Sequence, residues 1–172
     1  MAIYALGDRV PQIHPDAYVH PMATVIGDVR IGADSTIWPG AVLRGDYGTI
    51  TIGSRTSIQD GSVIHATAEK ATTVGNDCVV GHLVHLEGCT VEDGALVGSN
   101  SVVLHDVIVR SGALVAASAV VPNGMEVPAG AMALGIPAKL RLDAVRPEMI
   151  TLPAALYAAN GRRYATELRR VD

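Results

Sequence analysis

The chain has 172 residues, 49% of them hydrophobic, and carries a formal net charge of −4. This charge gives no general attraction to nucleic acid or anionic lipid, and no apolar stretch is long enough to span a bilayer. Because the N-terminal segment also lacks the apolar core of a secretion signal, we expect a single cytoplasmic domain over residues 1–172 that binds neither nucleic acid nor membrane.

An aliphatic side chain returns every six residues through most of the chain. The series comprises Ile13, Val19, Val25, Ile31, Ile37, Leu43, Ile52, Ile58, Ile64, Val74, Val80, Leu86, Val91, Val97, Val103, Val109, Val115, Val121 and Val127. A period of six fits neither a helix nor a flat strand, but it is typical of short strands joined by corners, as in hexapeptide-repeat β-helices. The absence of Phe suits the narrow core of such a coil. We therefore predict a mainly β fold, a parallel β-helix over about residues 11–132.

The repeat is interrupted at three places. The step is nine residues over 43–52 and ten over 64–74, and it shrinks to five over 86–91. Insertions into a rigid scaffold are where binding and catalytic groups tend to be placed. The polar residues beside these breaks are Arg44, Asp46, His65, His82, His85 and Glu87.

The repeat also predicts which of these polar residues are neighbours. If three hexads make one coil, every third aliphatic position lies on the same face, about 4.8 Å from the next. Arg44, His65 and Glu87 then form one exterior column, and Asp60 falls in register with His82 at a corner. Because a corner separates His82 from His65, these two meet only if a second copy packs alongside. The spacing predicts a site between subunits.

Two histidines and a carboxylate are suitable ligands for zinc or a similar divalent ion. We expect such roles for His65 and His82, because both stand beside breaks in the repeat. Glu87 could instead form an ion pair with Arg44. Ordinary solvated surface side chains are expected at His14, His20 and His105.

The last part of the chain has a different composition. After Pro128 the repeat fades, and about residues 142–170 are rich in Ala, Leu, Arg and Glu, which predicts a helix that covers the coils. Pro147 and Pro153 suit early positions of helical turns. Cys78 and Cys89 fall on or near inward small-residue positions, so we expect structural thiols and no disulfide.

Four segments carry a family resemblance: GlyAspValArgIleGly at 27–32, IleTrpProGlyAlaValLeuArgGlyAsp at 37–46, SerIleGlnAspGlySerValIleHis at 57–65 and ValGlyHis at 80–82. Through them the chain resembles the γ-class carbonic anhydrases, in the compact form of bacterial ferripyochelin-binding-like and phenylacetate-operon-type proteins. The resemblance implies a left-handed parallel β-helix that forms a homotrimer, with metal sites at the subunit interfaces.

The resemblance also implies roles for particular residues. His65 would be one metal ligand, and His82 would be another from the adjacent subunit. Gln59 would hydrogen-bond the metal-bound water or hydroxide, and Tyr157 would lie near the pocket. Arg44, Asp46 and Asp60 would make charged contacts across the interface. For Arg44 and Asp46, a trimer-stabilising ion pair is at least as good an interpretation as a catalytic role.

This chain departs from the family pattern at the third metal ligand. Glu87 occupies the position where the family usually has a third histidine, and a histidine stands at His85 instead. Either Glu87 coordinates the metal directly, or His85 does so with Glu87 as its hydrogen-bonded partner or as a base, or the metal is lost. The predicted column favours Glu87, since it lies directly beside His65.

The main functional hypothesis is reversible hydration of CO2 to bicarbonate by a metal-bound hydroxide, with Zn2+ as the expected ion and Fe2+ or Co2+ as alternatives. A carboxylate ligand would weaken the Lewis acidity of the metal, so we expect low activity that rises at alkaline pH. One alternative is a coenzyme A-dependent acyltransferase, since GlyIleProAlaLys at 135–139 resembles a segment of those enzymes and His65 or His82 could act as the base. The other is a non-catalytic trimer.

Overall fold

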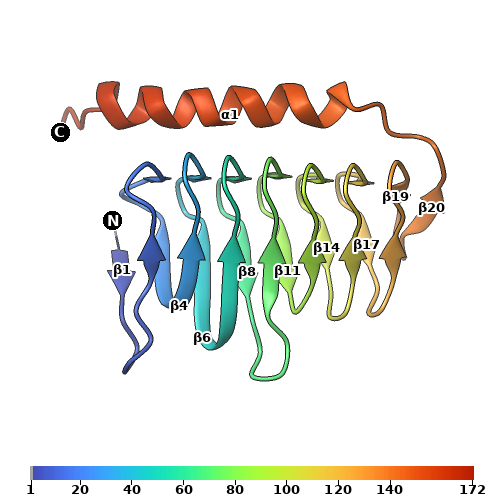
Figure 1. The fold of residues 1–172 in the computed structure, drawn as a ribbon, viewed down its shortest axis with the longest axis horizontal. Coiled ribbons are helices and arrows are strands. Elements are labelled where there is room, and N and C mark those ends of the chain that lie inside the picture. Colours follow the sequence, from blue (N-terminus) through green and yellow to red (C-terminus); the bar gives the residue numbers. More distant parts are fainter. Residues whose placement is uncertain (1) are drawn as a thin grey trace.

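The computed structural model describes residues 2–172, which form a left-handed parallel β-helix with one α-helix alongside (Figure 1). The strands and the helix are β1 (Ala2–Tyr4), β2 (Gln12–Ile13), β3 (Tyr18–Val19), β4 (Thr24–Ile31), β5 (Thr36–Ile37), β6 (Val42–Ile52), β7 (Ser57–Ile58), β8 (Val63–His65), β9 (Thr72–Val74), β10 (Val79–Val80), β11 (His85–Glu87), β12 (Thr90–Val91), β13 (Leu96–Val97), β14 (Val102–Val103), β15 (Ile108–Val109), β16 (Leu114–Val115), β17 (Val120–Val121), β18 (Glu126–Val127), β19 (Met132–Leu134), β20 (Lys139–Arg141) and α1 (Glu148–Glu167).

The strand register confirms the predicted coil. One sheet has the order β20-β19-β16-β13-β10-β7-β5-β3, and each pair of neighbours except β19 and β20 is parallel. The other two faces are joined into a second sheet because β4 and β6 continue around a corner. The first residues of β6 pair with β8, whereas its last residues pair with β9. Each face therefore receives one strand from each coil.

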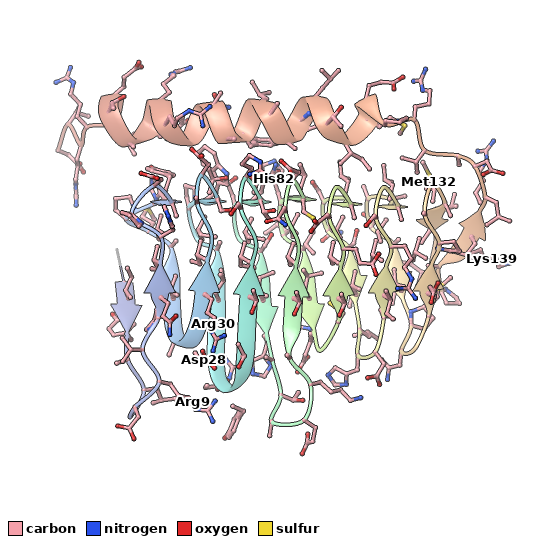
Figure 2. The ribbon with its side chains drawn as sticks, in the orientation of Figure 1. Arg9, Asp28, Arg30, His82, Met132 and Lys139 are labelled. Atoms are coloured by element: carbon pink, nitrogen blue, oxygen red, sulfur yellow. The ribbon has the colours of Figure 1, made fainter. Side chains whose placement is uncertain are left out.

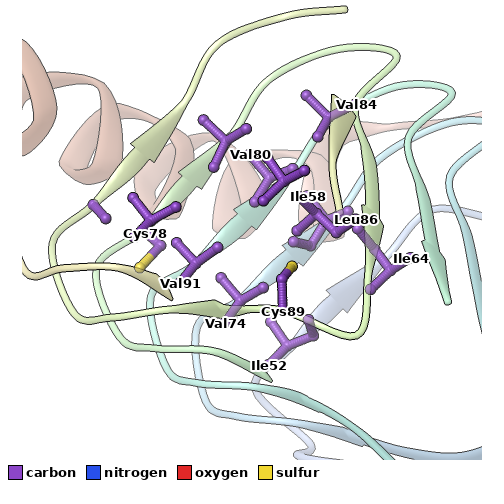
Figure 3. Close-up of a cluster of buried hydrophobic side chains, with 14 of the residues drawn as sticks. Ile52, Ile58, Ile64, Val74, Cys78, Val80, Val84, Leu86, Cys89 and Val91 are labelled. Carbon is purple, nitrogen blue, oxygen red and sulfur yellow. The ribbon is translucent and has the colours of Figure 1, made fainter. Parts of the chain in front are cut away.

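The aliphatic repeat positions point into the coils and form the core (Figure 3). Ile58 and Ile64 are fully buried, as are Val80 and Leu86 in the next coil. Cys78 and Cys89 lie in the same interior as free thiols, as expected. Burial raises their thiol pKa values, to about 11 for Cys78 and about 12 for Cys89. They are therefore packing residues in their unreactive thiol form.

Helix α1 runs along the outside of the β-helix (Figure 1) and packs on β3, β5, β7 and β10. Its buried residues include Ala154, Ala158 and Gly161. A Cβ at Gly161 would clash with the side-chain methyl of Thr36 on β5, so a glycine is what allows the helix to lie this close. The part of this face formed by β3, β5, β7 and β10 is consequently covered by the helix.

Three predicted boundaries differ from the structure. The helix begins at Glu148, directly after Pro147, and ends at Glu167, because the backbone of Leu168 is extended; residues 139–141 ahead of the helix form β20, antiparallel to β19. The β-helix begins near residue 2 and not near residue 11, because β1 pairs with β4. Neither β1 nor β20 follows the six-residue repeat, so the periodicity of the sequence did not predict them. No helix within residues 2–172 combines the length and apolarity needed to cross a membrane.

Candidate functional site

The predicted exterior column exists. Arg44 on β6 is in register with His65 on β8, and His65 is in register with Glu87 on β11. All three follow a buried aliphatic residue on their strand, so the alternation of the strand points their side chains outward. They lie on a face of the coils that α1 does not cover, since the helix contacts the sheet of β3, β5, β7 and β10.

His65 is held between two carboxylates. Its Nδ1 lies 2.9 Å from Glu87 Oε1, and its Nε2 lies 3.1 Å from Asp46 Oδ1. Asp46 is also hydrogen-bonded to Arg44. Both ring nitrogens can donate only when the imidazole is protonated, whereas the neutral ring donates one hydrogen bond and has one nitrogen free to accept a proton. The arrangement therefore suits an acid–base group.

The two carboxylates are stabilised in their charged forms. Hydrogen bonds from His65 and, more weakly, from His85 lower the pKa of Glu87 against the opposing effect of burial. Burial acts to raise the pKa of Asp46, but hydrogen bonds from Arg44 and His65 outweigh it and the pKa is lowered. At neutral pH both groups are therefore anionic.

Glu87 is surrounded by imidazoles, and one of them was not foreseen. Besides His65, His85 Nε2 lies 3.2 Å from Glu87 Oε2, and His105 Nε2 lies 3.6 Å from Glu87 Oε1. His105 Nε2 is buried without a hydrogen-bond partner although 35% of the side chain is exposed, so this residue is only in part the solvated side chain that was expected. The ring fits because Gly88 has no side chain: a Cβ there would lie 2.8 Å from His105 Cδ2. The shortened step over 86–91 was the available signal.

His82 and Asp60 form a second pair at the corner between β10 and β11. His82 Nδ1 lies 2.9 Å from Asp60 Oδ2, which confirms the predicted register. Both side chains are about half exposed, and Figure 2 shows His82 on the side of the coils that faces α1. His82 pairs with no member of the His65 cluster, as the intervening corner predicted. Its meeting with a second copy stays a prediction.

Two predicted site residues lie away from the His65 cluster in the structure. Gln59, which the resemblance placed at a metal-bound water, is only 3% exposed and follows β7 on the face that α1 covers. Tyr157 on α1 packs its ring against Trp38, with centroids 6.2 Å apart, and does not join the His65 cluster. The alternative ion pair between Arg44 and Glu87 does not form, because Arg44 pairs with Asp46.

The side chains of one chain do not complete the expected metal site. Within residues 2–172, no three His, Cys, Asp or Glu side chains converge on a point that could hold a metal ion. His65 Nδ1 and Glu87 Oε1 contact each other directly, and a zinc site needs at least three protein ligands. The residues of one chain therefore do not supply a complete set of zinc ligands at this place.

The parallel coils and their six-residue repeat define a hexapeptide-repeat protein. The family described as "Bacterial transferase hexapeptide (six repeats)" matches residues 11–45. A putative acetyltransferase from Bacillus cereus superimposes with a TM-score of 0.94 at 30% identity, covering 97% of this chain and 98% of that one. A perosamine N-acetyltransferase from Caulobacter crescentus, solved with CoA and GDP-perosamine, has a TM-score of 0.58 at 27% identity, covering 77% and 57%.

The chain belongs to the hexapeptide-repeat family that includes the carnitine operon protein CaiE. The CaiE of Citrobacter koseri is 39% identical over 149 residues, which are 87% of this chain and 76% of that protein. The alignment with CaiE of an Escherichia coli strain spans 53% of the relative's length. These similarities do not show the γ-class carbonic anhydrase that the sequence resembled, and they fit the two alternatives better, an acyltransferase or a non-catalytic trimeric relative.

Proposed function

We propose that this chain is an acyltransferase that uses an acyl-coenzyme A thioester, with His65 as general base. The observation that carries the proposal is the imidazole of His65 held between Glu87 and Asp46 on the uncovered face of the coils. Hexapeptide-repeat proteins named as acetyltransferases, one of them solved with CoA, support this chemistry. The acceptor is an amine or a hydroxyl, the two groups from which such a base removes a proton.

The roles of the three side chains follow from their hydrogen bonds. The reactive tautomer in this proposal is the one in which Nδ1–H of His65 donates to Glu87, so that the unprotonated Nε2 is the proton acceptor. As the acceptor attacks the thioester carbon, Nε2 takes its proton; the C–S bond then breaks, and the proton passes to the thiolate of coenzyme A. Asp46 stands beside Nε2 and stabilises the imidazolium in between.

A second copy would complete the site. The pair of His82 and Asp60 is exposed at a corner of the coils, where a neighbouring molecule can reach it. We expect a homotrimer in which this corner faces the His65 column of the next subunit. His82 would then form a wall of the substrate site and not the base, because it lies outside the carboxylate pair that orients His65.

Coenzyme A binding and turnover test the proposal together. We expect acetyl-CoA to raise the melting temperature of the purified protein and its thiol to be released when a suitable amine is added. His65→Gln should lower turnover about 10²- to 10⁴-fold while retaining coenzyme A binding. His14→Gln, at an exposed histidine of the N-terminal coil, is the matched control and should keep full turnover. Absence of any thermal response to acetyl-CoA in the wild-type protein would contradict the proposal.

A second candidate is the hydration of CO2 at a metal ion held by His65 and Glu87 together with His82 of another copy. It is favoured by the adjacency of His65 Nδ1 and Glu87 Oε1 and by the exposed position of His82. The ion, Zn2+ first and Fe2+ or Co2+ as alternatives, would supply Lewis acidity when bound. One metal per interface, CO2 hydration that increases in Glu87→His, and indifference to acetyl-CoA would replace the acyltransferase proposal.

A further inference from the structure

Leu83 has a backbone conformation that its side chain disfavours. Its φ is +56°, in the left-handed region, where a side chain crowds the backbone. The same turn position holds Gly61 in the preceding coil and Asn100 in the following one, two residue types that tolerate this region. Leu83 is the sole bulky apolar residue with a positive φ among residues 2–172. A strained backbone of this kind is concentrated at functional sites.

Burial of the Leu83 side chain against residues 2–172 does little to offset this strain. Leu83 is 64% exposed, so its side chain contributes little to the core. Its methyl groups lie over the neighbouring corner, since a Cβ at Gly61 would be 2.7 Å from Leu83 Cδ2. Its backbone N–H donates to Asp60 O at 2.9 Å, and it directly follows His82 in the chain. The exposed leucine is therefore fixed beside the pair of His82 and Asp60.

We propose that Leu83 determines the specificity of the enzyme for its acyl donor. The Leu83 side chain belongs to the copy that supplies His82, and it contacts the acyl chain of the thioester substrate as an apolar wall. This inference rests on the proposed acyl transfer between subunits. A leucine side chain in that place should strengthen the binding of acyl groups longer than acetyl, because each additional methylene is buried against the leucine and leaves water. The polar side chains of the corner, Asp60 and His82, are left to the polar part of the substrate.

The test compares two substitutions that separate the side chain from the backbone strain. Leu83→Ala removes the apolar group and retains the strain, whereas Leu83→Gly removes both, because glycine adopts positive φ freely. Binding of acetyl-CoA and hexanoyl-CoA is measured by calorimetry, and the melting temperature and oligomeric state are recorded for each variant. Leu152→Ala, at a leucine that is 68% exposed on α1, is the matched control.

We expect the wild-type protein to bind hexanoyl-CoA on the order of tenfold more tightly than acetyl-CoA. Both Leu83 variants should reduce this ratio to about twofold or less, and Leu152→Ala should retain it. Leu83→Gly should also melt at a higher temperature than Leu83→Ala. If both variants keep the wild-type ratio, or if they lose it only by dissociating into monomers, Leu83 does not contact the acyl chain. Failure of the wild-type protein to bind either thioester would instead overturn the acyl transfer itself.

Discussion

The face of the β-helix that α1 covers and the face that it leaves uncovered differ in role. On the covered face, the outward side chains of Trp38 and Val79 are 7% and 4% exposed beneath α1. On the uncovered face, the corresponding outward positions hold His65 and Glu87, which hydrogen-bond to each other and remain partly exposed. The inward residues of both faces are the same small set of aliphatic side chains. The repeat therefore builds a neutral scaffold, and the outward residues alone decide which face is structural and which carries chemistry.

The difference is enforced by the energetics of burial. The ring of Trp38 packs against Tyr18 and Tyr164, and its Nε1–H donates to Thr36 Oγ1 and Ser57 Oγ, so the indole N–H is paired beneath the helix. Covering His65 and its carboxylates with a helix would instead remove charges from water, which is costly. The covered face should thus contribute most of the stability, and the uncovered face should respond to pH.

The largest expected effect is on the covered face. Trp38→Ala removes the aromatic contact with α1 and should lower the free energy of unfolding by about 3–5 kcal/mol. Chemical denaturation at neutral pH measures this loss. Trp38→Phe, which keeps most of the ring contact, should lose much less. A loss below about 1 kcal/mol for Trp38→Ala would show that α1 contributes little to the stability of the coils.

A smaller effect is expected where the helix touches the sheet. Gly161→Ala places a methyl group against the Thr36 side chain and should destabilise the protein by about 1–3 kcal/mol, although alanine is the better helix former. The double variant Thr36→Ser with Gly161→Ala removes the clashing methyl and should recover stability. Thermal melts of the two variants test this, and equal melting temperatures would contradict the close approach.

The smallest effect belongs to the uncovered face and depends on pH. Glu87→Gln removes a charged partner of His65 and should cost about 1 kcal/mol near pH 7. Because the pKa of Glu87 is lowered in the folded protein, its contribution is fully present above its ordinary value of 4.5 and is lost as pH falls through the folded value. The difference between wild type and variant should therefore vanish in strong acid.

This pH dependence is what distinguishes the two faces. The loss caused by Trp38→Ala involves no ionisable group and should be the same at each pH where the protein folds. Denaturation curves for both variants at several pH values from 3 to 7 supply the comparison. A Glu87→Gln effect that stays constant over this range would mean that the carboxylate acts by packing and not by charge.

The sequence was sufficient for the parts of the fold that repeat. Six-residue spacing predicted the coil and the column of Arg44, His65 and Glu87, because register in a parallel stack follows from counting residues. The strands β1 and β20 were missed, since neither carries the repeat. The contact of His105 with Glu87 was also missed, because it depends on the turn at Gly88, where the count is irregular.

By itself, the sequence determined the scaffold and which polar residues share a column, since both depend on a local period. Only the tertiary structure decided how those residues are paired. The placement of His65 between Asp46 and Glu87 depends on corner conformations, which set side-chain directions that no local period encodes. Gln59 and Tyr157 lie outside the His65 cluster because of the face on which α1 packs. Packing between residues far apart in the chain determines which face that is.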